Sequence, residues 1–289
     1  MIVAFLGLGN MGGPMAANLV AKGFQVHGYD PAPGAGHDRV RRMSSAAEAV
    51  READAVVTML PSGTHVLDCY REILPALRPG TLLVDSSTID VEDARAAAGL
   101  VEAEGHLAVD APVSGGVVGA TEGTLTFMAG GSARALDLAE PILLAMGARV
   151  VRCGGAGAGQ AAKICNNMVL GVSMIAVSEA FALGRALGLT DQALFDVAAT
   201  SSAQCWALTV NCPVPGPVPT SPANRGYTGG FASGLMLKDL GLAEAAARAA
   251  GVDTAFGRAA REAYARFVEV DGPGRDFSAI ITTLRKDDA

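Results

Sequence analysis

The first 160 residues alternate short, almost wholly apolar runs with alanine-rich stretches of helical periodicity. This alternation is typical of a parallel sheet whose two faces are both covered by helices. We therefore predict an α/β domain over residues 1–160. The expected strands are Ile2–Leu6, Gln25–Tyr29, Ala55–Met59, Leu82–Asp85, Leu107–Asp110, Leu125–Met128 and Arg149–Val151, and the expected helices are Gly12–Lys22, Ser45–Glu52, Val91–Ala103 and Ser132–Ala145.

The pattern changes after the glycine-rich segment 154–159. From Gln160 to about Leu187, single glycines are the only helix-breaking residues, so we predict one helix roughly 42 Å long. No strand pattern returns, and further helices are expected at Thr190–Thr200, Leu235–Ala250 and Thr254–Val268. The sequence thus predicts a second, all-helical domain over residues 161–289.

The long helix contains the most apolar stretch of the chain, from Met168 to Leu187. Polar residues interrupt it, among them Glu179 and Arg185, so a buried helix is favoured over a membrane span. The chain begins directly with an apolar run and lacks the basic flank of a signal peptide. We expect a cytoplasmic protein that does not bind a membrane.

Composition excludes several other classes of function. The formal net charge is −7 and the sequence pI is about 5.1, which disfavours nucleic acid as a partner. Five cysteines form no C-x-x-C pair, and the four histidines show no zinc-like spacing, so we expect reduced thiols and no metal site.

One motif carries specific chemistry. Gly7-Leu8-Gly9-Asn10-Met11-Gly12 matches G-x-G-x-x-G between an expected strand and an expected helix, and the next strand ends at Asp30. In a dinucleotide site these glycines permit a tight turn, close approach of the pyrophosphate, and packing of the helix on the strand. Asp30 would accept the ribose hydroxyls of NAD and repel the phosphate of NADP. The next cation along the chain is only Arg39, so NAD is favoured.

Other turns at expected strand ends have two interpretations each. Met59–Ser62 and Asp85–Thr88 either contact a ligand at the carboxyl edge of the sheet or are ordinary turns that cap helices. Ser114-Gly115-Gly116 either forms a nest of N–H groups suited to a carboxylate or is a plain turn. The segment 213–230 is either a surface connector or a loop that closes over a ligand.

Five blocks of sequence show a wider resemblance. They are FLGLGNMGGPMAANL (5–19), DAPVSGGVVGATEGTLTFMAGG (110–131), GAGQAAKICNNM (157–168), SSAQCW (201–206) and PVPGPVPTSPANRGYTGGFASGLMLKDLGLA (213–243). On these blocks the chain resembles the β-hydroxyacid dehydrogenase family, which implies a Rossmann domain, a long interdomain helix, a helical domain that forms a homodimer or homotetramer, and no metal. The last two blocks favour members that oxidise 3-hydroxyisobutyrate.

The resemblance also assigns roles to residues. It implies that Lys163 is the catalytic lysine, and that Ser114, Gly115, Gly116 and Asn167 hold the substrate. It places NAD on the Gly7–Gly12 turn, Asp30, Leu60, Pro61, Thr88 and Lys238. His65 stands where the family often has Asn, which puts a cofactor contact there in doubt. Trp206 is either a core residue or a wall of the substrate pocket, and Phe231 and Tyr227 are further candidates for that wall.

The implied reaction is the NAD-dependent oxidation of 3-hydroxyisobutyrate to methylmalonate semialdehyde, a step of valine catabolism. A tartronate semialdehyde reductase, a broader β-hydroxy acid dehydrogenase and a non-catalytic NAD sensor are the alternatives. Lys163 suits proton transfer because partial burial or a neighbouring cation lowers a lysine pKa from ~10.4 toward roughly 7–8. Its alternative is an ordinary solvated lysine.

Neighbours of these residues complete the expectations. Asn167 follows Lys163 by four positions and so shares its helix face, whereas Asn166 points about 100° away and is assigned no role. Asp110 is expected to be structural, because a second carboxylate would repel an acidic substrate. The pair Lys238-Asp239 is either part of the site or an exposed ion pair.

Overall fold

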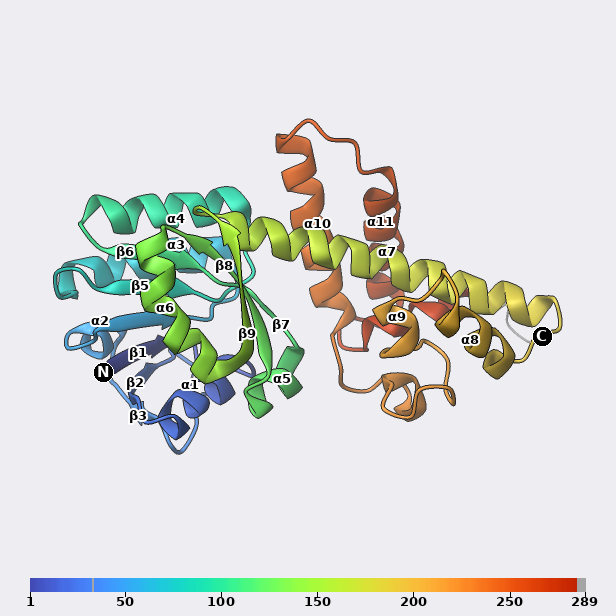
Figure 1. Ribbon diagram of the computed structural model, residues 1–289, viewed down its shortest axis with the longest axis horizontal. Helices are drawn as coiled ribbons and strands as arrows, with labels where there is room; N and C mark the ends of the chain where they lie inside the picture. The colour runs from blue at the N-terminus through green and yellow to red at the C-terminus, as the bar shows by residue number, and fades with distance from the viewer. Residues whose placement is uncertain (33, 285–289) are drawn as a thin grey trace. The chain divides into compact units, whose positions relative to one another are not determined.

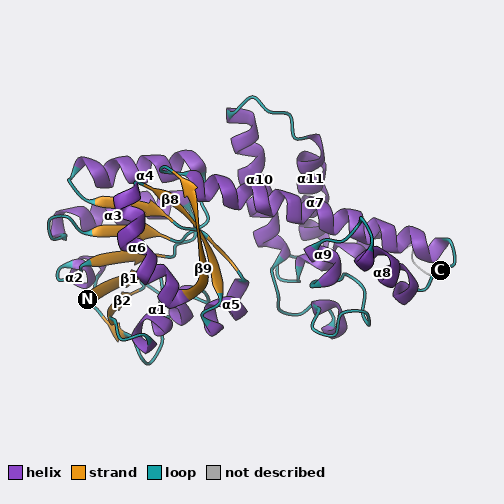
Figure 2. Cartoon of the chain, in the orientation of Figure 1, coloured by secondary structure: helices purple, strands orange, loops and turns teal. Residues whose placement is uncertain are grey.

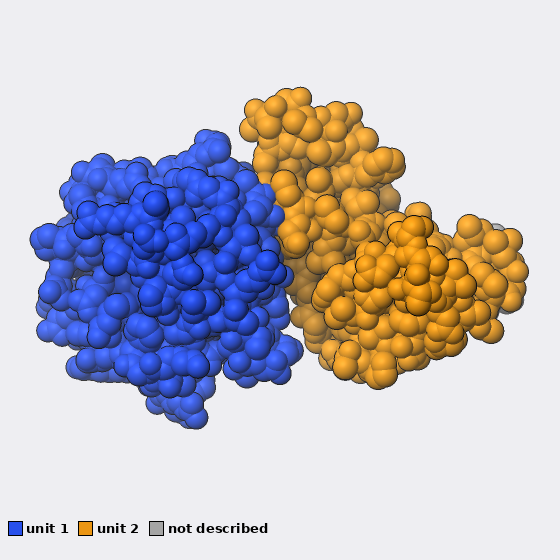
Figure 3. All heavy atoms as spheres, in the orientation of Figure 1, with its two compact units in different colours: residues 1–163 blue, residues 164–289 orange. Residues whose placement is uncertain are grey.

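The computed structural model describes residues 1–32 and 34–284. It divides into two compact units, Met1–Lys163 and Ile164–Ala289, which Figure 3 colours separately. The division lies three residues beyond the boundary expected from the sequence. The predicted long helix is α7, which spans Ala158–Ala186 and so contributes residues to both units.

A single sheet of nine strands, among the residues described, forms the centre of the first unit (Figures 1 and 2). Its order is β3-β2-β1-β4-β5-β6-β8-β7, with β9 paired to β8. The strands from β3 to β6 are all parallel. The bounds are β1 Ile2–Leu6, β2 Gln25–Tyr29, β3 Arg41–Arg42, β4 Ala55–Thr58, β5 Leu82–Asp85, β6 Leu107–Asp110, β7 Val113–Ser114, β8 Leu125–Gly131 and β9 Gly147–Gly154.

Helices cover both faces of this sheet, because successive side chains of a strand point to opposite sides. Val3 and Phe5 of β1 pack in one core with α1, α5 and α6, whereas Ala4 and Leu6 pack in another with α2, α3 and α4. The doubly wound α/β fold expected from the sequence is thereby confirmed. The helices are α1 Gly12–Ala21, α2 Ala46–Val50, α3 Gly63–Ile73, α4 Val91–Ala103, α5 Gly116–Glu122 and α6 Ala133–Met146, with the short 3₁₀ helix η1 at Leu74–Ala76.

The far edge of the sheet differs from the expectation of a wholly parallel sheet. Strand β8 runs antiparallel to both β6 and β7, with Val113 opposite Phe127. Apolar patterning shows that a strand is buried but not which way it runs, so the sequence could not reveal this reversal. Strands β3 and β7 and helices α3 and α5 were also not predicted.

The second unit is helical, and among its described residues only an isolated bridge between Ala232 and Asp276 has β pairing. Helices α10 and α11 lie side by side (Figure 1). Met174 and Phe181 of α7 share one core with residues of both, including Met236 and Tyr264. The bounds are α8 Asp191–Thr200, α9 Trp206–Thr209, η2 Pro222–Arg225, α10 Ser233–Ala249, α11 Ala255–Asp271 and η3 Phe277–Leu284.

Helix α7 is buried on one face only, so the prediction of a buried helix holds for that face and not for the other. Met174 is fully buried, but Val169 is 62% exposed and Leu183 is 61% exposed. By length and composition alone, the helix is long and apolar enough to cross a membrane. Of its most apolar 18-residue stretch, 33% is buried. Core helices of soluble proteins can be equally long and apolar. Arg185, near the end of this helix, forms an ion pair with Asp191.

Candidate functional site

The carboxyl ends of four neighbouring parallel strands carry the residues expected to hold the dinucleotide. The Gly7–Gly12 turn follows β1, Asp30 follows β2, Leu60 follows β4 by two residues, and Thr88 follows β5 by three. In an open α/β sheet this edge is where ligands bind, at the point where the strand order reverses. The structure therefore brings these four candidates to one edge of the first unit.

The glycine turn has the shape that a pyrophosphate requires. A Cβ on Gly7, whose φ is +94°, would lie 2.2 Å from the Met59 carbonyl oxygen. A Cβ on Gly12 would lie 1.9 Å from the Gly7 oxygen, so both positions exclude any side chain. Gly9 is different, since it is exposed and nothing lies within 4 Å of its Cβ position. The turn is thus close-packed against the protein at Gly7 and Gly12 and open at Gly9, where the pyrophosphate of NAD would approach.

Asp30 is bound to the same turn. One carboxylate oxygen accepts the N–H of Leu8 at 2.7 Å, and the other accepts the N–H of Ala32 at 2.8 Å. Arg39 is the first cation after Asp30 in the sequence, but the arginine that contacts this segment is Arg42. It donates to the carbonyl oxygens of Asp30 (2.7 Å) and Ala32 (2.9 Å). These bonds hold the Asp30 carboxylate beside the glycine turn. Its contact with ribose stays a prediction.

The turns after β4 and β5 are joined by a buried hydrogen-bond chain. Leu60 donates its N–H to Ser87 Oγ at 2.8 Å, and Ser87 Oγ donates to Asp85 at 2.6 Å. The same Asp85 oxygen accepts from Thr58 Oγ1 at 2.7 Å. The interpretation of the first turn as a helix cap also holds, because Ser62 caps α3. The cap of α4 is Asp90, which lies beyond the Asp85–Thr88 turn.

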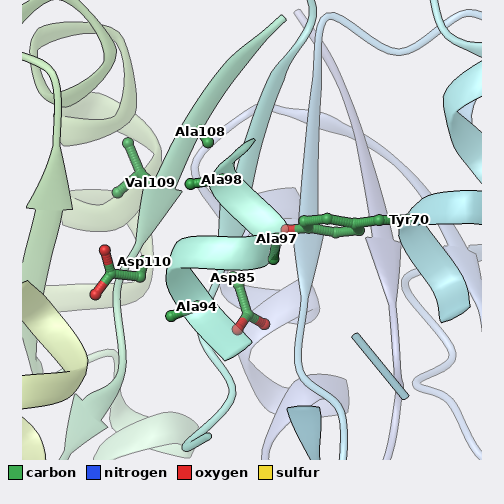
Figure 4. Close-up of a pocket in the computed structure, with 8 residues that line it drawn as sticks. All are labelled: Tyr70, Asp85, Ala94, Ala97, Ala98, Ala108, Val109 and Asp110. Carbon is green, nitrogen blue, oxygen red and sulfur yellow. The ribbon is translucent and has the colours of Figure 1, made fainter. Parts of the chain in front are cut away.

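Two buried aspartates end adjacent strands on this edge, and Figure 4 shows both among the residues that line one small pocket. Asp85 and Asp110 are register partners on β5 and β6, and Tyr70 lines the same small pocket. Burial raises the pKa of Asp85 to about 6, although hydrogen bonds from Ser87 and Thr58 oppose the rise. Burial also raises the pKa of Asp110. Reasoning from sequence named Asp85 only as the first residue of the Asp85–Thr88 turn and did not predict its burial, because a strand-end Asp has no distinctive local pattern.

Asp110 fastens the beginning of α7. Its two carboxylate oxygens accept the N–H groups of Gly157 (2.7 Å) and Gln160 (2.9 Å). A Cβ on Gly159 would lie 2.2 Å from the Met128 carbonyl oxygen, so the helix start is pressed against β8. Helices leave their first N–H groups unpaired, and Asp110 satisfies two of these. The structural role expected for Asp110 is what the hydrogen bonds show.

Lys163 lies on the buried face of α7. The lysine is only 7% exposed, and Gln160 and Asn167 are 0% and 2% exposed. The three residues are spaced i, i+3 and i+7 and so form one stripe, whereas Cys165 and Asn166 are exposed. The alternative of a solvated lysine is therefore wrong.

The expected substrate nest has a suitable backbone. Gly115 and Gly116 are exposed and have φ values of +130° and +59°. Gly115 is the N-cap of α5, and nothing lies within 4 Å of the Cβ position of Gly116. Ser114 precedes them at the end of β7. Carboxylate binding here stays a prediction, as does a cofactor contact of His65, whose Nδ1 lies 2.7 Å from Ser62 Oγ.

The second unit contains the remaining candidates. Asn167 donates its amide to the Asp239 carboxylate, and it accepts from Asn166 at 2.9 Å, so Asn166 supports Asn167 although it was assigned no role. Asp239 is 4% exposed, which rules out an exposed ion pair for this residue beside Lys238. Sequence reasoning named Asp239 only as a neighbour of Lys238.

Trp206 is 50% exposed, so the core interpretation is wrong and its indole remains accessible. Phe231 packs edge-on against Phe277 with ring centroids 5.8 Å apart, and its N–H donates to the buried Asp276 at 2.7 Å. Asp276 also accepts from Asn211, at the other end of the 213–230 segment. Tyr227 within the segment donates to the Pro213 carbonyl. These bonds hold the ends of the segment together.

Metal ligands do not gather in the described parts of the chain. Within residues 1–32 and 34–284, no three side chains of His, Cys, Asp or Glu are grouped to hold an ion. Burial raises the pKa of Cys69 to about 12 and that of Cys212 to about 11, so these thiols stay protonated.

Comparisons with known proteins agree with this arrangement. A family model described as the NAD-binding domain of 6-phosphogluconate dehydrogenase matches residues 2–155. A second, described as NAD-binding of NADP-dependent 3-hydroxyisobutyrate dehydrogenase, matches residues 157–284. A Mycobacterium tuberculosis protein named probable 3-hydroxyisobutyrate dehydrogenase is 55% identical over 98% of this chain and 97% of its own.

Two further matches extend this result. A Pseudomonas aeruginosa protein named NAD-dependent L-serine dehydrogenase is 44% identical over 96% of each chain. The solved structure of the M. tuberculosis 3-hydroxyisobutyrate dehydrogenase with L-serine is 54% identical, covers 99% of both chains and has a TM-score of 0.95. These matches span nearly the whole length, and they confirm the resemblance and NAD as the cofactor. The chain belongs to the β-hydroxyacid dehydrogenase family.

Proposed function

We propose that this chain oxidises 3-hydroxyisobutyrate to methylmalonate semialdehyde with NAD, and that Lys163 exchanges the hydroxyl proton. One observation carries the proposal: a lysine that is only 7% exposed lies on α7, the helix whose start is hydrogen-bonded to Asp110 at the end of β6. Most lysines extend into solvent, so a buried one beside a dinucleotide fold has a chemical reason to be there.

Different residues of this chain would bind the cofactor, the substrate carboxylate and the substrate hydroxyl. The Gly7–Gly12 turn, Asp30, Leu60 and Thr88 would hold NAD, which when bound accepts the hydride of the alcohol carbon. Ser114 to Gly116 would bind the substrate carboxylate through N–H groups and a hydroxyl. Asn167, one turn beyond Lys163, would hold the hydroxyl oxygen.

Lys163 performs the proton transfer. Its neutral amine takes the hydroxyl proton during oxidation, and its ammonium returns the proton to the aldehyde oxygen during reduction. In the ammonium form it also polarises the carbonyl, which favours attack by a hydride. Asp239 orients Asn167 through its hydrogen bond, so the amide presents a fixed geometry.

Replacement of the lysine tests the proposal. Lys163→Ala should lower kcat by about 10²-fold or more, since general acid–base catalysis contributes that much, while the Kd for NAD stays nearly unchanged. Lys22→Ala is the matched control, because Lys22 is exposed at the end of α1. Near-native turnover of Lys163→Ala would refute the role of the lysine. If the wild-type chain binds NAD but gives no increase in absorbance at 340 nm with any hydroxy acid, it is instead a non-catalytic sensor.

L-serine is a second candidate substrate. The P. aeruginosa relative is named for it, and the M. tuberculosis structure was solved with it. Both acids carry a primary alcohol on the carbon next to the one that bears the carboxylate. Measurement of kcat/KM for 3-hydroxyisobutyrate, L-serine, glycerate and, in the reverse direction, tartronate semialdehyde would rank the alternatives.

Self-association is a further expectation of the proposal. Large apolar side chains are exposed in the second unit, including Phe256 at 81% and Val270 at 84%. We propose a homodimer or homotetramer, and sedimentation of the full chain would test it.

A further inference from the structure

We propose that Gln160 is a positioning residue, whose side-chain amide fixes the catalytic lysine relative to the cofactor-binding loop after β5. Gln160 Nε2 donates to the Ser87 carbonyl oxygen at 2.7 Å, and Gln160 Oε1 accepts the N–H of Ile89 at 3.2 Å. The two bonds fall on either side of Thr88. This inference rests on the proposed roles of Lys163 and Thr88.

The amide joins two parts of the chain that are far apart in sequence. Its bonds connect residue 160 with residues 87 and 89, across separations of 73 and 71 positions. Gln160 is fully buried, and both ends of its side-chain amide are paired. A buried amide that satisfies two main-chain groups of one loop allows a single register between helix and loop.

Lys163 lies one helical turn after Gln160 on the same buried face of α7. The main-chain N–H of Gln160 is itself held by Asp110 at 2.9 Å, so the first turn of the helix cannot slide along β6. The helix start is therefore fixed through its backbone by Asp110 and through a side chain by Gln160. Rotation of α7 by a small angle would move the lysine away from its working position while leaving the helix intact.

The loop that Gln160 holds is also connected to the other cofactor turn. Ser87, whose carbonyl receives the amide, accepts the Leu60 N–H through its hydroxyl at 2.8 Å. Loss of the amide would thus disturb Thr88 and Lys163 together. The glycine turn after β1, which makes the pyrophosphate site, has none of these bonds.

Two substitutions separate positioning from folding. Gln160→Ala removes both bonds and should lower kcat by about 10 to 100-fold, because misplacement of a catalytic group by 1 Å can cost that much. The Kd for NAD should change by less than about threefold, and the deuterium isotope effect on kcat should rise as hydride transfer becomes limiting. A variant that merely folded less well would lower kcat without changing the isotope effect.

In Gln160→Glu, a change of pH can make or break the hydrogen bond to the Ser87 carbonyl within a single variant. A protonated Glu can donate to the Ser87 carbonyl and accept from Ile89, whereas a carboxylate repels that carbonyl. Complete burial at this position disfavours a carboxylate and so raises the pKa of the introduced Glu above its usual value. The ratio of the variant's kcat to that of the wild type should therefore rise at least fivefold as the pH falls from 8.5 to 6. The same change at the exposed Gln192 of α8, Gln192→Glu, should give a flat ratio.

Native kcat in Gln160→Ala, or a pH-independent ratio in Gln160→Glu, would overturn the inference. Lys163→Ala is measured in the same series to separate the two proposals. If Lys163→Ala is inactive while the Gln160 variants are native, only the positioning role fails. If Lys163→Ala turns over normally, the proposed catalytic function fails, whatever Gln160 does.

Discussion

Replacement of Asp85 by Asn should change the pH dependence of folding in a defined direction. The carboxylate is fully buried, one oxygen accepts three hydrogen bonds, and the other has no partner within the described residues. Asn keeps the accepting oxygen and puts an uncharged NH₂ in place of the other. The variant therefore preserves the bonds to Thr58 and Ser87 while it removes the titratable group.

The magnitude follows from the pKa. Burial raises the pKa of Asp85 from 3.8 to about 6, so the folded chain holds this proton more tightly than the unfolded chain. The resulting stabilisation is fully present below pH 3.8 and is lost as the pH rises through 6. A pKa difference of about 2 corresponds to roughly 3 kcal/mol at 1.36 kcal/mol per pKa unit. Asn also buries an unpaired NH₂, a pH-independent cost of about 1–3 kcal/mol.

The expected result is a change in how steeply the free energy of unfolding depends on pH. Between pH 4.5 and 7.5, the free energy of unfolding of Asp85→Asn should rise relative to wild type by about 1–3 kcal/mol. Urea titrations followed by far-UV circular dichroism report both units, and Trp206, the single tryptophan, reports the second unit alone. Asp68→Asn on the surface of α3 is the control, since its side chain is 66% exposed. A difference between Asp85→Asn and wild type that stays constant with pH would refute the reasoning.

Two further predictions concern the nucleotide site. Gly9→Ala should raise the Kd for NAD at least tenfold with Tm within about 2 °C of wild type, because the new Cβ meets no protein atom within 4 Å but occupies the open side of the turn. Gly12→Ala should lower both NAD affinity and Tm, since its Cβ would lie 1.9 Å from the Gly7 oxygen; equal Tm values for the two variants by differential scanning fluorimetry would contradict this. Asp30→Ser combined with Pro31→Arg should shift the ratio of kcat/KM for NAD over NADP toward NADP by at least tenfold, and an unchanged ratio would show that Asp30 does not recognise the ribose.

The sequence was informative where a feature depends on residues close together in the chain. The Gly7–Gly12 turn could be identified because strand, turn and helix follow one another within a few residues. Helix α7 could be predicted to within two residues at its start because 3.6-residue periodicity is a local property. The shared face of Lys163 and Asn167 followed from their spacing alone.

Tertiary structure decided which polar groups meet. Gln160 is one amide in an apolar helix, and only the fold shows that it bonds to the main chain more than 70 positions away. Asp85 and Asp110 end separate strands, and their pairing depends on strand order and register, which hydrophobic patterning does not encode. The antiparallel direction of β8 was hidden for the same reason.

The sequence by itself thus determined the α/β and helical halves and the nucleotide turn, because local propensity and spacing specify these features. The lysine was singled out by the resemblance to a known family. Only the folded chain determined the environment of Asp85, the anchoring of α7 and the exposure of Trp206. Burial, and with it the shifted pKa values, arises when distant segments remove a group from water together. No window of sequence contains all of those segments.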